Sequence, residues 1–327
     1  ILTLEKLLQQ LKKISKELID VKNVNVNACL HPHPLMPDSY ADIEVEWFSW
    51  MPGFDSRDLG DDDEEPLFRD NNILLYDKIE EIAVDRFNIA LVNVWPLLDS
   101  YLINSLHISI DITGMLCSSS TLAAYNYVDS NPQKGNYIFN LAQSYLYQLL
   151  VASDNGKELK LKYHTTWEHE IIHLVDHWES VKSSVYRDSD LSTVYYNYYL
   201  LEYRIEGIAE LYYLLKGGID DIKNISQAKE KFQSNLDRIQ KLVIDKPKIT
   251  SKEKDTEFKT YDFYELGPWI ILDMLRIFQG GYHEELINNV IAKVEAGEVV
   301  EHNVIIDVIR IALSMKTDEF LNAHLKN

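Results

Sequence analysis

The spacing of apolar residues changes near Thr165, and this change most constrains the fold. Before it, short runs with apolar residues at alternate positions, such as "LHISIDI" at 106–112, predict β-strands. After it, nearly every segment has helical spacing, with the pairs Gly217-Gly218 and Gly280-Gly281 as helix ends. We therefore expect an α+β protein with a mixed α/β N-terminal half and a mainly helical C-terminal half.

Four other segments before residue 165 carry local signals. We expect strands in "IALVNVW" at 89–95 and "GNYIFNLA" at 135–142, an amphipathic helix over residues 1–19, and a long exposed acidic loop over 51–72. By its position alone, the 135–142 strand is a candidate for an edge strand that aligns a substrate. We place the domain boundary between residues 130 and 131, and the region 1–130 resembles no known family.

The composition limits the classes of partner. Of the 327 residues, 46% are hydrophobic and 26% charged, which is typical of a soluble globular protein. The net charge of −20 argues against a nucleic-acid or anionic-membrane partner. No apolar run reaches the 18 or more residues of a membrane span, so we expect a protein without one.

The sequence does not determine the cellular compartment. Cys29 and Cys117 are the only cysteines, which excludes a disulfide framework but not one bridge. The sequence opens at Ile1 without an initiating Met, so a removed leader is compatible with it. The sequence is compatible with both a cytoplasmic and an exported location.

The stretch "TTWEHEIIHLVDHWE" at 165–179 predicts a helix that carries metal ligands. Thr165 and Glu168 match a capping box, which would begin the helix. His169 and His173 are four residues apart, about 40° around the axis and about 6 Å along it, so both can bind one ion. With Glu170 they form the pattern H-E-x-x-H, in which two histidines bind zinc and the glutamate takes a proton from the metal-bound water.

The third ligand must come from elsewhere. His177 lies about 12 Å from His169 along a straight helix, too far to share an ion with bonds near 2 Å. Asp176 and Glu179 stand where the metzincin pattern requires glycine and histidine, so we do not expect that subclass.

A second predicted helix, in "YRIEGIAELYYLLKGG" at 203–218, supplies better candidates. Glu206 and Glu210 lie on one face of it, so Glu206 could bind the metal. Glu210 could then accept a hydrogen bond from a ligating histidine and fix its orientation. The small residues Gly207 and Ala209 would let this helix approach the histidine helix closely.

The motifs "HEIIH" and "EGIAE", with 32 residues between His173 and Glu206, resemble those of the gluzincins, the thermolysin-like and aminopeptidase-like zinc metallopeptidases. The resemblance covers about residues 165–275. It implies a zincin-like catalytic domain over residues 131–327 with one Zn²⁺ ion. It also implies His169, His173 and Glu206 as the metal ligands, Glu170 as the general base, and Glu210 as the carboxylate that orients a ligand.

A third segment, "YELGPWIILDML" at 264–275, is similar to a Y-x-x-G segment of several gluzincin families. In the aminopeptidase-like families its tyrosine donates a hydrogen bond to the oxyanion of the tetrahedral intermediate. The resemblance therefore implies this role for Tyr264, with Tyr261 as the neighbouring alternative. The chain lacks a G-x-M-E-N exopeptidase signature, so the resemblance does not choose between endo- and exo-cleavage.

Together these observations predict a zinc-dependent metallopeptidase that acts on a peptide or protein substrate. One alternative is a zinc-bound binding or regulatory module without turnover. Glu170 argues against that alternative, because a purely structural zinc site needs no base. The other alternative is a metal-free helical interaction protein that carries the motif by chance.

Overall fold

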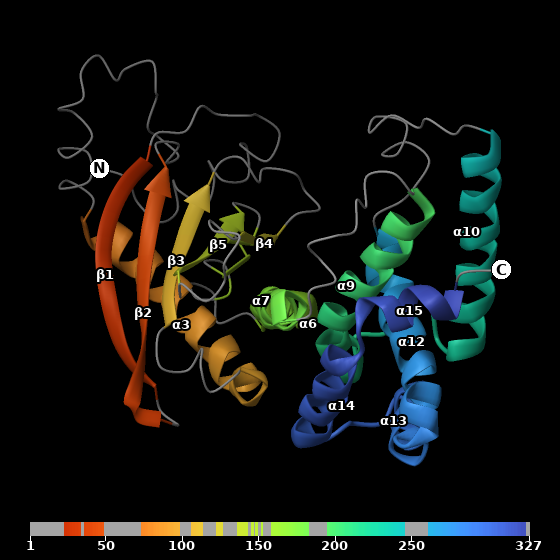
Figure 1. Cartoon of the computed structure of the whole chain (residues 1–327). Helices are drawn as coiled ribbons and strands as arrows, with labels where there is room; N and C mark the ends of the chain where they lie inside the picture. The colour runs from red at the N-terminus through yellow and green to blue at the C-terminus, as the bar shows by residue number, and fades with distance from the viewer. Residues whose placement is uncertain are drawn as a thin grey trace. The chain divides into compact units, whose positions relative to one another are not determined.

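The computed structural model describes residues 23–33, 36–48, 73–98, 106–113, 122–126, 136–142, 145–146, 148–149, 152, 158–182, 195–245 and 261–324. Within them the α+β class is confirmed, because a β-sheet precedes a long series of helices (Figure 1). The chain divides into two compact units, residues 1–171 and 172–327. The division falls inside helix α7, and the domain boundary predicted after residue 130 stays a prediction.

The first unit contains a five-stranded mixed sheet with the order β1-β2-β3-β5-β4. The pairs β2–β3 and β3–β5 are parallel, whereas β1–β2 and β4–β5 are antiparallel. The strands are β1 (Asn23–His33), β2 (Met36–Phe48), β3 (Leu106–Thr113), β4 (Ala123–Asn126) and β5 (Asn136–Ala142). The "LHISIDI" and "GNYIFNLA" strands are thus confirmed.

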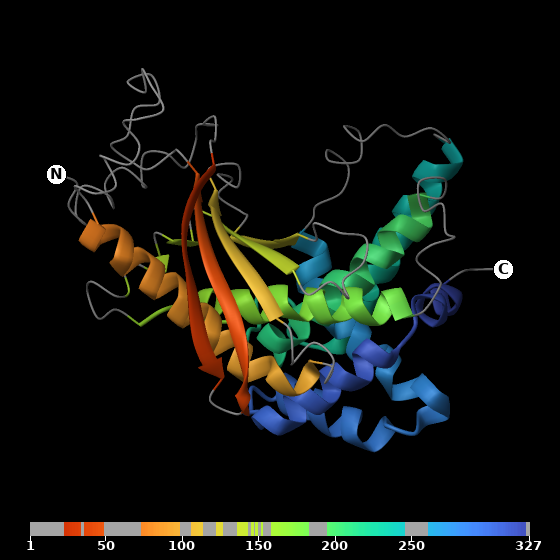
Figure 2. The ribbon, with the colours of Figure 1, turned by 60° about the vertical axis from the view of Figure 1, so that its left-hand side comes forward.

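Helix α3 (Ile73–Val94) makes the crossover between the parallel strands β2 and β3, which a short turn cannot join. In both views it lies behind the strands (Figure 1 and Figure 2). The strand predicted for "IALVNVW" is therefore wrong, because most of this run belongs to α3 and its end to a 3₁₀ turn, Trp95–Leu97. The buried residues of α3 recur at helical spacing: Ala83, Val84, Phe87, Ala90, Leu91 and Val94.

Aromatic rings connect α3, the sheet and the start of the histidine helix α7 (Thr166–Lys182). Phe87 of α3 lies edge-on to Phe139 of β5, with ring centroids 4.9 Å apart, and to Trp167 of α7, at 5.3 Å. All three rings are fully buried. This packing fixes the first turn of α7 against the sheet.

The edge strand differs from the one expected. Strand β5, from the "GNYIFNLA" segment, lies between β3 and β4, so its prediction as an edge strand is wrong. Among the described strands, the four-residue β4 occupies that edge of the sheet and runs antiparallel to β5. The backbone groups of β4 that do not face β5 therefore point out of this edge of the sheet.

The second unit is helical, as predicted, and its glycine pairs lie at helix ends. Helix α9 ends at Leu215, just before Gly217, and α12 ends in a 3₁₀ turn that contains Gly280 and Gly281. At these two helix ends Gly217, Gly280 and Gly281 have positive φ, a backbone conformation that glycine adopts readily. The helices are α9 (Tyr195–Leu215), α10 (Ile225–Asp245), α12 (Tyr261–Ile277), α13 (Glu284–Glu295), α14 (His302–Ser314) and α15 (Thr317–His324).

Helices α9 and α12 cross at two glycines. A Cβ atom built on Gly207 would lie 2.7 Å from both the carbonyl carbon and the oxygen of Gly267. One turn earlier on each helix, the rings of Tyr203 and Phe263 meet edge-on with centroids 4.9 Å apart. The predicted close approach at Gly207 thus occurs, but its partner is α12.

Two predicted segments, the helix over residues 1–19 and the loop over 51–72, lie outside the described residues. Among the helices that the structure describes, none combines the length and the apolar character needed to cross a membrane.

Candidate metal centre

Helix α7 presents the H-E-x-x-H residues, but it does not begin with the predicted capping box. The Thr165 hydroxyl donates to the carbonyl oxygen of Leu161, at 3.0 Å, in the preceding turn. The Glu168 carboxylate accepts a hydrogen bond from the Asn93 amide of α3, also at 3.0 Å. The capping box is therefore wrong, and Glu168 instead joins α7 to α3.

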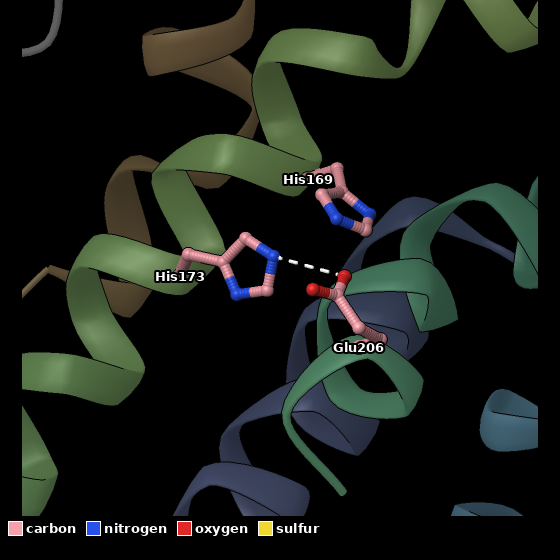
Figure 3. A group of neighbouring side chains, drawn as sticks. All are labelled: His169, His173 and Glu206. Atoms are coloured by element: carbon pink, nitrogen blue, oxygen red, sulfur yellow. Dashed lines mark hydrogen bonds and ion pairs between the residues drawn. The ribbon is translucent and has the colours of Figure 1, made fainter. Parts of the chain in front are cut away.

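The structure brings together the three predicted ligands. His169, His173 and Glu206 each offer one ligand atom, and these atoms lie within 4.8 Å of one another (Figure 3). His169 and His173 come from successive turns of α7, and Glu206 points toward them from α9 (Figure 3). The Nε2 atom of His173 is 3.1 Å from the Glu206 Oε2 atom. The side chains of His173 and Glu206 are only 15% and 16% exposed.

The donor set and the one measured pair of ligand atoms are compatible with a tetrahedral metal ion. Two ligands that each lie about 2.1 Å from one tetrahedral ion are about 3.4 Å apart. The 3.1 Å separation of His173 and Glu206 is close to that value. Two imidazoles and one carboxylate are also a donor set found in catalytic zinc sites, where they leave the fourth position for water or substrate. The group could therefore hold one metal ion.

Glu170 lies between the two histidines in sequence and is only 8% exposed. Its Oε2 atom accepts a hydrogen bond of 2.8 Å from the backbone N–H of Tyr125 in β4. Tyr125 is paired with Phe139 of β5. The predicted general base is thus held directly beside the edge strand of the sheet.

Sequence reasoning missed a buried ion pair between α7 and α9. The Arg204 guanidinium donates two hydrogen bonds of 3.0 Å to the Asp176 carboxylate, one to each oxygen. It also donates to the backbone carbonyl of Met315, at 2.9 Å, between α14 and α15. Asp176 follows His173 by one turn, and Arg204 precedes Glu206 by two residues. An acid within the apolar "HLVDHW" run was the available signal, because charged residues are rarely buried unless they are paired.

The position of Glu210 does not test its predicted role. It lies on α9 one turn after Glu206 and is half-buried. The pKa of Tyr213 is raised to about 12, first by burial and then by the negative charges of Asp220 and Glu210. Glu210 therefore lies close enough to Tyr213 to affect its titration, and its proposed bond to a ligating histidine stays a prediction.

Tyr264 lines a small recess of the second unit, together with Tyr213, Gly218 and Trp269. Its side chain is 41% exposed, and none of the three candidate ligands lines this recess. Its role as the oxyanion donor stays a prediction, as does the alternative of Tyr261.

His177 is not part of the three-residue group, in agreement with the helical spacing. Burial lowers the pKa of His177, partly opposed by the charge of Asp176. This half-buried imidazole is therefore more readily neutral than a free histidine.

Comparison of the chain with protein-family models, with curated proteins and with solved structures found no match. The functional assignment therefore depends on the motif and on the geometry of the site.

Proposed function

We propose that this protein is a zinc-dependent metallopeptidase with a zincin-like catalytic domain. One observation carries the proposal. Helices α7 and α9 bring His169, His173 and Glu206 together although 32 residues lie between His173 and Glu206, and Glu170 lies on the same helix as the two histidines. A chance H-E-x-x-H motif does not require a carboxylate from another helix at the position of a third ligand.

In this proposal the three residues would hold one Zn²⁺ ion. Zinc, when bound, supplies Lewis-acid chemistry that polarises the substrate carbonyl and makes a coordinated water more acidic. The neutral imidazole nitrogens of the histidines and the carboxylate of Glu206 hold the ion. Their burial on two helices keeps the donor atoms in place before the ion arrives.

Glu170 is the proposed general base. It accepts a proton from the attacking water while the water oxygen forms a bond to the carbonyl carbon of the scissile peptide. It then gives this proton to the leaving amine as the C–N bond breaks. The hydrogen bond from the Tyr125 amide fixes the Oε2 atom of the carboxylate.

The position of β4 supports an extended polypeptide as the substrate. The outward-facing backbone groups of an edge strand can pair with an added chain, and side-chain pockets then provide specificity. Because the Tyr125 N–H is bonded to Glu170, an added chain would pair with other outward-facing groups of β4 and would pass beside the proposed base. This contact favours an enzyme over a zinc-bound module without turnover, since a structural site has no need of a base at a strand edge.

Metal analysis of the purified protein tests the proposal first. We expect one zinc per chain by mass spectrometry. His173→Ala and Glu206→Ala should each bind zinc at least about 100-fold more weakly, because even the loss of an outer partner commonly costs about 10–100-fold. His283→Ala, at the start of α13, is a matched histidine control and should retain zinc. A wild-type chain without zinc would contradict the proposal, and full zinc in Glu206→Ala would exclude Glu206 as the third ligand.

The predicted oxyanion role of Tyr264 is tested by Tyr264→Phe, which removes only the hydroxyl group. We expect kcat to fall about 100-fold at unchanged zinc content, because one oxyanion donor commonly contributes about 100–1,000-fold. Tyr261→Phe is the matched variant one turn away. If Tyr261→Phe lowers kcat and Tyr264→Phe does not, the role belongs to Tyr261.

A further inference from the structure

We infer that the buried Arg204–Asp176 ion pair positions the residues of the metal centre. It holds α9 against α7 so that the Glu206 carboxylate lies next to the His173 imidazole. This inference depends on the proposed metal site. It assigns to two residues outside the ligand set a role in the affinity for zinc.

The first support is the location of the pair. Asp176 and His173 are three residues apart on α7, so they lie on adjacent turns of one face. On α9, Arg204 and Glu206 are two residues apart and leave the helix on nearly opposite sides, about 160° apart around its axis. The bonds from Arg204 and Glu206 to α7 therefore approach from different sides of α9. Together they fix its rotation as well as its distance from α7.

The second support is the geometry of the ion pair. Both carboxylate oxygens of Asp176 accept from the guanidinium at 3.0 Å, and the two side chains are only 6% and 3% exposed. A bidentate pair of this kind allows little sliding or tilting, because both bonds must stay aligned. The Nη2 atom that binds one Asp176 oxygen also donates to the Met315 carbonyl, which holds the guanidinium further in place.

The third support is that stability alone does not account for the pair. A buried ion pair is often no more stable than apolar side chains of similar size, because both charges lose their hydration. What it provides is a defined geometry. Zinc coordination needs that geometry, because a shift of about 1 Å in the Glu206 carboxylate would take it out of bonding distance.

The double variant Asp176→Leu with Arg204→Met separates positioning from stability. It replaces the pair with apolar side chains, so the chain should fold with an unchanged or higher melting temperature. We expect it to bind zinc about 10–100-fold more weakly than wild type, measured by competition with a chelator. Cobalt(II) bound in place of zinc should show altered visible absorption, which reports the coordination geometry. Arg204→Lys keeps the charge but not the two parallel bonds, and should give a smaller loss.

Lys231→Met is the matched control. It removes ion pairs with Asp262 and Glu265 between α10 and α12, in the same unit but outside the ligand set. It should leave the zinc affinity within about twofold of wild type, far below the loss commonly seen for an outer partner of a ligand.

The outcomes are distinguishable. A wild-type chain that binds no zinc overturns the proposed function together with this inference. A wild-type chain that binds zinc, with a folded double variant of equal affinity, overturns only the inference. If the double variant does not fold, Arg204→Lys decides, because an unchanged zinc affinity and cobalt spectrum in that variant also overturn it.

Discussion

Glu170→Gln should abolish most peptide hydrolysis while the protein keeps its zinc. Removal of a general base commonly lowers the rate by about 100–10,000-fold, so we expect kcat to fall within that range. The glutamine retains an oxygen that can accept the 2.8 Å hydrogen bond from the Tyr125 amide, so the contact with β4 should survive. Cleavage of casein and of a peptide library, with the zinc content measured in parallel, checks this result.

The control for Glu170→Gln is Glu230→Gln, which makes the same chemical change at an exposed position of α10. It should cleave like wild type. Unchanged turnover in Glu170→Gln would show that the carboxylate is not the base. Zinc-loaded wild-type protein that cleaves no member of the library would favour the binding or regulatory module.

Gly207→Ala should destabilise the second unit by about 2 kcal/mol. Alanine normally stabilises a helix by about 1 kcal/mol relative to glycine. Here the new methyl carbon would lie 2.7 Å from backbone atoms of Gly267, which cannot rotate away as a side chain can. Overpacking of this kind commonly costs about 1–3 kcal/mol, and we expect the upper end because both partners are backbone. Urea denaturation followed by circular dichroism measures the change.

Ser234→Ala is the control for Gly207→Ala. It adds an alanine to the exposed face of α10, where no such crossing occurs, and should leave the stability unchanged or slightly higher. Gly267→Ala should resemble Gly207→Ala, because its Cβ atom would lie 2.8 Å from the Gly207 Cα atom. If Gly207→Ala is as stable as wild type, the two helices can separate at little cost.

The candidate ligands could be predicted from the sequence because their spacing is local. The spacing of four positions from His169 to His173 places both on one face of a helix, whatever the rest of the chain does. The carboxylate at Glu206 followed from a second motif with its own helical spacing. The α+β class followed in the same way from the change of apolar period along the chain.

The features that could not be predicted from the sequence depend on contacts between residues that are distant in sequence. The run "IALVNVW" is apolar except for Asn93, and periodicity cannot assign such a short run to a strand or a helix. The edge of the sheet depends on strand order, which placed the four-residue β4 outside β5. The Arg204–Asp176 pair joins residues 28 positions apart, and neither residue has a local pattern that names its partner.

The bond between β4 and Glu170 also determines how this part of the site can vary. Its donor is a main-chain amide, which every amino acid except proline possesses. The identity of residue 125 can therefore change, and with it the packing of its side chain on Phe139, while the hydrogen bond to Glu170 is retained. The alignment of the Glu170 carboxylate thus depends on the main chain of β4 and not on the side chain at this position.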